Sequence, residues 1–313
     1  MINFPAWLEP AQAKLGPLIE QGRLPHALLI HGPCGTGRRL LALWIAGRVL
    51  GIDSLDLQAG LGAGRVLDPD RAPSHPDLRL FQLEEDKRDI TVDSMRALIA
   101  FIQLTSHRGG AKVAFICPAE AMNRNAENSL LKTLEEPPAH SLIILVADSI
   151  SRLAPTVVSR CHRERISMPS MESAETWLQS LDPTADWRLA LELAGGAPIG
   201  ALQIQQSDFP KQAMRFEKDI SALMSRRSTP VEVARRWSTQ DKDLCLRWLY
   251  QRVSSELRDS HLQMNGNMLS MEHSYGYLRE INELRRLQRA GLNAEMQLTN
   301  LLTRWYGGVG VVN

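Results

Sequence analysis

The stretch GGAKVAFI, residues 109–116, followed by NAENSLLKTLEEPP, residues 125–138, decides how this chain folds. Gly109-Gly110 predicts a turn, because glycine is the commonest residue where the backbone reverses. The run from Val113 to Ile116 is short and wholly apolar, which is typical of a parallel strand covered on both faces. A turn followed by a buried strand is therefore expected here.

A helix is expected directly after this strand. Ala126, Leu130 and Leu134 recur at helical spacing, and Asn123 or Asn125 can cap the first turn. Pro137-Pro138 ends the helix, because the residue before a proline is pushed out of the helical region. Strand and helix together make one α/β unit.

The strand end itself carries an unusual pair of residues, Cys117-Pro118. In ATP-hydrolysing proteins of this architecture an Asp-Glu pair stands there, one carboxylate for Mg²⁺ and one to polarise the attacking water. Neither Cys117 nor Pro118 can coordinate a hard cation as a carboxylate does. The sequence therefore predicts that this position performs no Mg²⁺-dependent hydrolysis.

The bulk composition narrows the class of protein. A chain of 313 residues suggests two or three domains. With 36 basic and 35 acidic residues it is nearly neutral, so any contact with nucleic acid is expected to be shared with partners. Four scattered cysteines indicate a reducing compartment and exclude a four-cysteine zinc site. Without a leader pattern or a membrane-spanning run, a soluble cytoplasmic protein is expected.

A second glycine-rich segment resembles a phosphate-binding loop. Residues 27–30 form an apolar strand, a loop follows, and residues 40–50 form an apolar helix. The candidate phosphate-binding residues are Gly32, Gly35, Gly37 and Arg38. A working loop has Lys and then Ser or Thr after its last glycine, whereas Arg38 and Arg39 stand there. The segment either binds nucleotide weakly without hydrolysis or is a vestigial loop kept for packing, and we prefer the latter.

Other segments complete the α/β pattern. Further strands are expected at residues 78–83, at 142–146 and around Arg165-Ile166, and a helix from Ser94 to Leu104 with Asp93 as its N-cap. Residues 51–74 resemble a poorly structured insertion. The His75-Pro76-Asp77 segment is interpreted as a structural turn rather than a metal site.

From Glu172 onward only helices are expected. Residues 172–206 indicate a small helical lid, and residues 207–313 a helical bundle whose last helix has an apolar face made by Leu298, Leu301, Leu302 and Trp305. The basic doublets Arg226-Arg227, Arg235-Arg236 and Arg285-Arg286 could line a DNA passage, but solvated helix faces are the preferred interpretation. The expected domains are residues 1–167, 168–206 and 207–313.

Several segments together carry a family resemblance: LPHALLIHGPCGTGR (24–38), HPD (75–77), ITVDSMRAL (90–98), GGAKVAFI (109–116), NSLLKTLEEPP (128–138) and VVSRC (157–161). In this order they resemble the bacterial DNA polymerase III clamp loader, an AAA+ family. The resemblance implies an α/β fold: a P-loop-type parallel sheet domain, then the small helical lid and an all-α C-terminal collar domain.

Two subunit types of that family share these segments, the ATP-hydrolysing gamma/tau type and the non-hydrolysing delta-prime type. The chain departs from the ATPase pattern at Arg38-Arg39, at Cys117-Pro118 and at Ile199, where the ATPase has its second sensor arginine. These departures favour the delta-prime type. It has no catalytic centre of its own but belongs to a DNA-directed DNA polymerase holoenzyme, and helps to load the sliding clamp onto primed DNA with gamma/tau and delta subunits.

The resemblance also implies a role for Ser159-Arg160-Cys161. In the family this arginine reaches across a subunit boundary to ATP held by a neighbouring gamma/tau subunit, where a guanidinium can stabilise charge on the transferred phosphoryl group. Relatives commonly carry a four-cysteine zinc module, but residues 51–74 contain no cysteine. Neither zinc nor a tightly bound cofactor is expected, although weak ATP or ADP binding stays open.

Two alternatives stay open. The chain could be a gamma/tau-type motor that uses Arg38 and Glu120 as unconventional substitutes, or a stand-alone nucleotide-binding regulator without fixed partners.

Overall fold

The computed structural model describes residues 4–52, 75–83, 89–107, 109–207, 209–240, 242–263, 271–286 and 293–309. The chain divides into two compact units, Met1–Gln203 and Ile204–Asn313. The expected insertion lies almost wholly outside the described residues. The predicted border between sheet domain and lid at residue 167 stays a prediction.

One five-stranded parallel sheet forms the centre of the N-terminal unit. Its strands are β1 (Ala27–His31), β2 (Leu78–Gln82), β3 (Lys112–Cys117), β4 (Ser141–Ala147) and β5 (His162–Arg165). Their order is β2-β3-β4-β1-β5, and every pairing is parallel. The predicted parallel sheet is thus confirmed, although β5 lies slightly earlier than expected. Because β1 lies between β4 and β5, the loop that follows it meets the end of β4.

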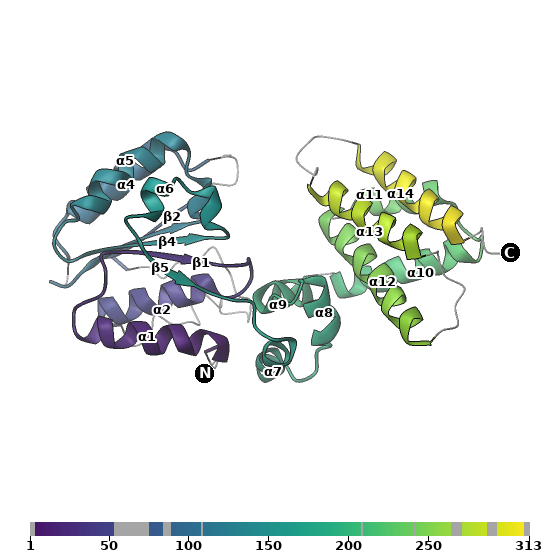
Figure 1. The fold of residues 1–313 in the computed structure, drawn as a ribbon, viewed down its shortest axis with the longest axis horizontal. Helices are drawn as coiled ribbons and strands as arrows, with labels where there is room; N and C mark the ends of the chain where they lie inside the picture. Colours follow the sequence, from purple (N-terminus) through teal and green to yellow (C-terminus); the bar gives the residue numbers. More distant parts are fainter. Residues whose placement is uncertain are drawn as a thin grey trace. The chain divides into compact units, whose positions relative to one another are not determined.

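Helices cover both faces of this sheet (Figure 1). On one face lie α1 (Glu9–Glu20), preceded by a short 3₁₀ turn, and α2 (Arg38–Leu50). On the other lie α4 (Val92–Gln103), α5 (Arg124–Glu135) and the short α6 (Pro155–Val158). The three inner strands β1, β3 and β4 are largely apolar because both faces are covered, and β4 is buried along its whole length, whereas the edge strands β2 and β5 carry charged residues.

Side-chain capping begins α5 but not α4, whose predicted N-cap needs a correction. Asn123 caps α5 by accepting a hydrogen bond from the Ala126 N–H at 2.9 Å, as one of the two expected candidates. Asp93 is not the N-cap of α4, which is Thr91. Asp93 instead lies in the first turn, where the positive end of the helix dipole stabilises its negative charge. Its Oδ1 also forms an ion pair with Nη1 of the exposed Arg96 at 3.0 Å.

The His75-Pro76-Asp77 segment forms a hydrogen-bonded turn before β2, in agreement with the structural interpretation. Asp77 is 1% exposed and accepts bonds from the His107 N–H at 2.9 Å, the Ser106 hydroxyl at 3.0 Å and Lys112 Nζ at 3.1 Å. Burial alone would raise the pKa of Asp77, but these donors outweigh it and hold that pKa well below its usual range. The turn therefore carries a buried, fully charged carboxylate.

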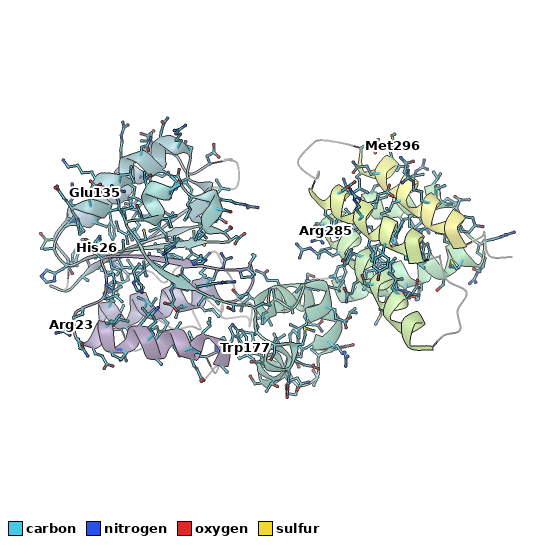
Figure 2. The ribbon with its side chains drawn as sticks, in the orientation of Figure 1. Arg23, His26, Glu135, Trp177, Arg285 and Met296 are labelled. Carbon is cyan, nitrogen blue, oxygen red and sulfur yellow. The ribbon has the colours of Figure 1, made fainter. Side chains whose placement is uncertain are left out.

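Three helices complete the N-terminal unit where the lid was expected: α7 (Met171–Leu181), α8 (Trp187–Leu193) and α9 (Pro198–Gln206), whose last residues pass into the second unit. Trp177 of α7 packs edge-on against Trp7, with ring centroids 5.4 Å apart (Figure 2). The lid helices therefore contact the first residues of the chain.

The C-terminal unit is helical throughout its described residues. It contains α10 (Phe209–Met224), α11 (Pro230–Ser238), α12 (Lys242–Gln263), α13 (Met271–Arg286) and α14 (Ala294–Val309). Trp237 lies at its centre, 4.6 Å from the Phe216 ring and 5.7 Å from the Trp248 ring. The predicted apolar face of α14 points into this core, because all four of its residues are at most 2% exposed. Among the described helices of both units, none has the length and apolar character needed to cross a bilayer.

Candidate functional site

The glycine loop between β1 and α2 is tightly enclosed by its own unit. A side chain at Gly32 would place its Cβ 2.0 Å from the Ile166 carbonyl oxygen, so only glycine fits beside the segment that leaves β5. Gly35 has a φ of 75°, and a Cβ there would lie 2.9 Å from that of Ala197. The Gly35 carbonyl oxygen accepts a hydrogen bond from the Ile199 N–H at 2.9 Å. The start of α9 therefore packs directly on the loop.

Two residues that the sequence analysis did not single out hold the loop in this shape. Thr36 is fully buried, and its hydroxyl donates to the Pro33 carbonyl at 2.8 Å. Trp7 donates its indole N–H to the Thr36 carbonyl at 2.8 Å. Gly37 then serves as the N-cap position of α2 with a φ of 90°. These bonds occupy the Thr36 hydroxyl and the carbonyl oxygens of Pro33 and Thr36, and they tie the loop to its own unit.

The positive charge of Arg38 is paired within its own unit. Arg38 is 8% exposed, and its guanidinium forms an ion pair with Asp148, which follows β4. Glu120 accepts a hydrogen bond from the Asp148 N–H at 2.8 Å. The two residues proposed as substitute catalytic groups are therefore both tied to Asp148, although Arg38 Nη1 and Glu120 Oε2 have no hydrogen-bond partner among the described residues.

The strand end next to the loop lacks the chemistry for a metal ion. Burial raises the pKa of the Cys117 thiol to about 11, against the opposing effect of the Arg39 and Arg38 charges. The thiol is therefore neutral at physiological pH, whereas a metal ligand must be deprotonated. Arg39 lies over the Phe115 ring, 5.8 Å from its centroid, where a working loop needs a hydroxyl for Mg²⁺. These residues do not fit a Mg²⁺-nucleotide site.

The three side chains of the Ser159-Arg160-Cys161 triplet lie in different environments. Cys161 is 8% exposed in the core under α5 and α6, and burial raises the pKa of its thiol to about 12. Ser159 donates its hydroxyl to the Thr156 carbonyl at 3.1 Å, which closes the end of α6. Arg160 is the member at the surface, with about one third of its side chain exposed. Ser159 is exposed as well, so Arg160 is the one charged residue of the triplet that a neighbouring molecule can reach.

The guanidinium of Arg160 is held in a defined place by its own chain. Its Nε donates to Glu135 Oε1 at 2.7 Å, and its Nη2 bonds the same oxygen. Its Nη1 donates to the Thr156 carbonyl at 2.8 Å. Figure 2 labels Glu135 at the end of α5. Because the donors of this planar group are fixed from two sides, its rotamer is restricted before any ligand arrives.

Helix α5 positions both ends of α6. Near its start the buried Glu127 accepts a bond from the Ala154 N–H at 2.9 Å, just before α6, and near its end Glu135 holds Arg160 just after it. The sequence analysis identified Arg160 and the helix but neither carboxylate partner. A weak signal existed, since both acids belong to the NAENSLLKTLE segment that the analysis considered decisive.

The sheet order, the glycine loop between β1 and α2, and a surface arginine beyond α6 together define an AAA+-like P-loop-type protein whose loop has Arg38-Arg39 where a working loop has Lys and then Ser or Thr. Comparison with known families makes this more specific. Residues 8–170 match the family model described as DNA polymerase III, delta subunit. The chain belongs to this family, and the relatives place it with the delta' subunits of DNA polymerase III.

Two curated relatives carry that name. The DNA polymerase III subunit delta' of Pseudomonas aeruginosa is 30% identical to this chain, over 79% of this chain and 75% of the relative. The subunit delta' of Haemophilus influenzae is 29% identical over 95% of each chain. The likeness to the second relative therefore includes the helical C-terminal unit.

A solved structure shares the fold. A DNA polymerase III gamma subunit-related protein from Thermotoga maritima aligns over 95% of this chain and 99% of its own length, with a TM-score of 0.56 and 16% identity. At this identity the likeness establishes the architecture alone.

Proposed function

We propose that this chain acts as the non-hydrolysing delta' subunit of a clamp loader in the cytoplasm. With gamma/tau and delta subunits it helps to load the sliding clamp onto primed DNA for the polymerase III holoenzyme. Its specific contribution is Arg160, which it supplies in trans to ATP held by a neighbouring gamma/tau subunit. The chain itself hydrolyses nothing.

One contrast between two arginines carries this proposal. Arg38, in the chain's own loop, is buried and paired with Asp148, whereas Arg160 lies at the surface on a restricted rotamer. The first is buried inside its own unit, whereas about one third of the second side chain is exposed. This is the arrangement expected of a subunit that contributes to a neighbour's site and not to its own.

The chemistry follows from the guanidinium. At a subunit boundary Arg160 would exchange the Glu135 carboxylate for the oxygens of a γ-phosphate, which bear more negative charge in the transition state. Its planar fork can donate two parallel bonds to phosphate oxygens, which a lysine ammonium cannot. In well-studied cases an arginine supplied in trans is worth about 10³ to 10⁵ in rate.

We further propose that the glycine loop binds no nucleotide that the protein uses, and that the chain binds no zinc. The Ile199 contact with the loop, the turned hydroxyl of Thr36 and the Arg38–Asp148 pair support the vestigial reading of Gly32, Gly35, Gly37 and Arg38. The loop then serves to anchor α9.

The test is the ATPase rate of a clamp loader reconstituted from this chain with gamma/tau and delta subunits, clamp and primed DNA. Arg160→Ala should assemble normally yet lower DNA-stimulated turnover by about tenfold or more. Arg188→Ala, which removes an exposed arginine on α8, is the matched control and should leave the rate unchanged.

Equal turnover with the wild type and Arg160→Ala subunits would remove the proposed role of this residue. Mg·ATP hydrolysis by the purified chain alone would favour the motor alternative. Tight nucleotide binding without assembly would favour the regulator.

A further inference from the structure

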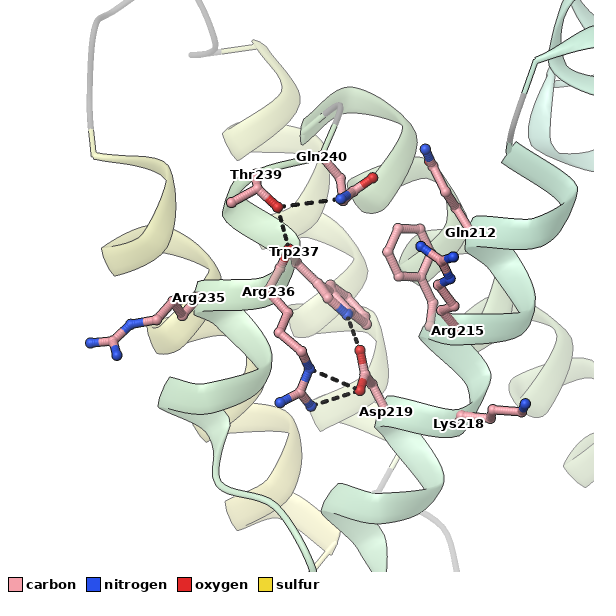
Figure 3. A pocket seen from close by; sticks show the side chains of 10 residues that line it. Gln212, Arg215, Lys218, Asp219, Arg235, Arg236, Trp237, Thr239 and Gln240 are labelled. Atoms are coloured by element: carbon pink, nitrogen blue, oxygen red, sulfur yellow. Dashed lines mark hydrogen bonds and ion pairs between the residues drawn. The ribbon is translucent and has the colours of Figure 1, made fainter.

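A groove opens between α10 and α11 in the C-terminal unit, with a volume of about 610 Å³. It lies within the size range of sites that bind small ligands or short peptide segments. Its lining residues are Gln212, Arg215, Phe216, Lys218, Asp219, Arg235, Arg236, Trp237, Thr239 and Gln240. Figure 3 shows Arg215 and Gln240 extending into the space between the two helices, while Arg235 and Lys218 point outward on opposite sides.

The single carboxylate of the groove is fully engaged. Asp219 Oδ1 accepts bonds from Arg236 Nε at 3.1 Å and Nη2 at 2.6 Å, and its Oδ2 accepts the indole N–H of Trp237 at 3.0 Å. Asp219 therefore holds Arg236 in place across the two helices (Figure 3). Its remaining capacity to neutralise the other cations is small.

The other cations of the groove are poorly compensated. Among the described residues no ion pair is found for Arg215 or Lys218, both of which are exposed. Arg235 is 76% exposed, and its Nε lies 3.4 Å from the Glu295 carboxylate, which is a long contact. The groove thus has four cationic side chains around one occupied carboxylate.

The charge of the whole C-terminal unit is concentrated in the same helices. Residues 204–313 contain 16 lysines and arginines and 12 acidic residues. Residues 209–238, which span α10 and α11, contain 7 of these basic residues and 3 of the acidic ones. The rest of the unit is balanced, so its positive excess lies on the hairpin that forms the groove.

The remaining chemistry distinguishes between anionic partners. Proteins that bind single-stranded nucleic acid usually stack bases on accessible aromatic rings, but Phe216 and Trp237 are 2% and 1% exposed. Gln212 and Gln240 carry side-chain amides, which both donate and accept hydrogen bonds and so match the N–H and C=O groups of a peptide. A phosphodiester backbone offers acceptors only.

We propose that this groove is a docking site for an acidic segment of a partner polypeptide. Carboxylates of the segment pair with Arg215 and the prepositioned Arg236 inside the groove and with Lys218 at its rim, and the segment's backbone bonds the two glutamine amides. This site is independent of Arg160 and of the proposed ATPase role.

The experiment measures fluorescence anisotropy of a labelled peptide of alternating Glu and Ser, about twelve residues long, titrated with the full chain at low salt, where exposed ion pairs are least screened. The comparison probes are its Gln-for-Glu counterpart and a single-stranded oligonucleotide of similar length. The acidic peptide should bind, and the neutral one should bind at least about tenfold more weakly.

The variant Arg215→Gln/Lys218→Gln should weaken binding of the acidic peptide about tenfold. The control Arg279→Gln/Arg304→Gln removes two exposed cations of the same unit, on α13 and α14, and should change binding less than about twofold. Thermal midpoints of both variants check that the fold is intact.

Four results would overturn the proposal. The neutral peptide could bind as well as the acidic one, or the groove variant could bind as tightly as the wild type. Tighter binding of the oligonucleotide, lost in the groove variant, would assign the groove to nucleic acid. Self-association of the chain that disappears in this variant would assign it to a second copy.

Discussion

Arg160 reaches its position because of Glu135, and this pair decides what the residue can do. The two side chains are one third and one half exposed, so the pair adds little to stability, of the order of 0–1 kcal/mol. Its effect is geometric: it restricts a long side chain that would otherwise sample many rotamers.

Glu135→Gln should therefore lower the DNA-stimulated ATPase of the reconstituted complex about three- to tenfold, and less than Arg160→Ala does. The amide keeps one acceptor but loses the charge that attracts the guanidinium. The control is Glu136→Gln, an exposed acid next in sequence for which the described residues show no ion pair. The thermal midpoint of both variants should stay within about 1 °C of the wild type. A faster ATPase would show that Glu135 holds Arg160 back.

At this scale the sequence predicts functional residues better than it predicts their partners. Arg160 was identified from a short motif, and so were the loop residues Gly32, Gly35, Gly37 and Arg38. Glu135, Glu127 and Asp148 were not assigned as partners, because a contact between distant side chains leaves no periodicity in the sequence. The missing carboxylates at positions 117 and 118 were visible directly, since an absence of ligand chemistry requires no knowledge of the fold.

At the scale of elements, the glycine loop and α9 behave as one packed structure. The Ile199 N–H bonds the Gly35 carbonyl, and Ala197 leaves no room for a side chain at Gly35. Such a contact fixes the start of α9, the last of the lid helices, on the glycine loop instead of leaving it free to close over a ligand.

Gly35→Ala should destabilise the N-terminal unit by about 2–4 kcal/mol, from a left-handed backbone and a steric clash together. Gly22→Ala isolates the first effect, because Gly22 has a φ of 64° and a Cβ at this position would meet no other atom within 4 Å; its cost should be about 1 kcal/mol. Calorimetric unfolding of both variants gives the difference. Equal costs would mean that the α9 contact contributes nothing to stability.

Most elements could be predicted because their signals are local. The inner strands are largely apolar runs, and Asn123, Pro230 and Asn293 begin helices by short-range rules. The N-cap of α4 was misassigned because Thr91 and Asp93 are both good capping residues, and only the backbone angles distinguish them. The apolar face of α14 was predicted, but its burial against the rest of its own unit depends on contacts far along the chain.

At the scale of the whole molecule, near-neutrality hides an uneven distribution of charge. Residues 1–203 contain 20 basic and 23 acidic side chains, whereas residues 204–313 have a basic excess. The basic doublets were interpreted as solvated helix faces with neighbouring acids. Two of their arginines do pair with acids, Arg236 with Asp219 and Arg285 with Asp243. A total charge cannot show where such pairing is incomplete.

The intact chain should also fail to respond to nucleotide. A ligand that binds the folded state raises its stability by RT ln(1 + [L]/Kd), so about 1 mM Mg·ADP should shift the thermal midpoint by less than about 1 °C if the loop is vestigial. A gamma/tau subunit with the Lys-Ser/Thr loop serves as the positive control. A shift of several degrees in this chain would instead indicate retained nucleotide binding.

The distance between the two acids of α5 is fixed by the helix that carries them. Glu127 and Glu135 are eight residues apart, about 12 Å along the axis, and each meets one end of α6. Inserting or deleting a single residue between them would turn the second acid by about 100° around the helix, away from Arg160. Substitutions on the outer surface of α5 are therefore tolerable, but a change in the number of residues between its acids would misalign the guanidinium even if the helix itself stayed intact.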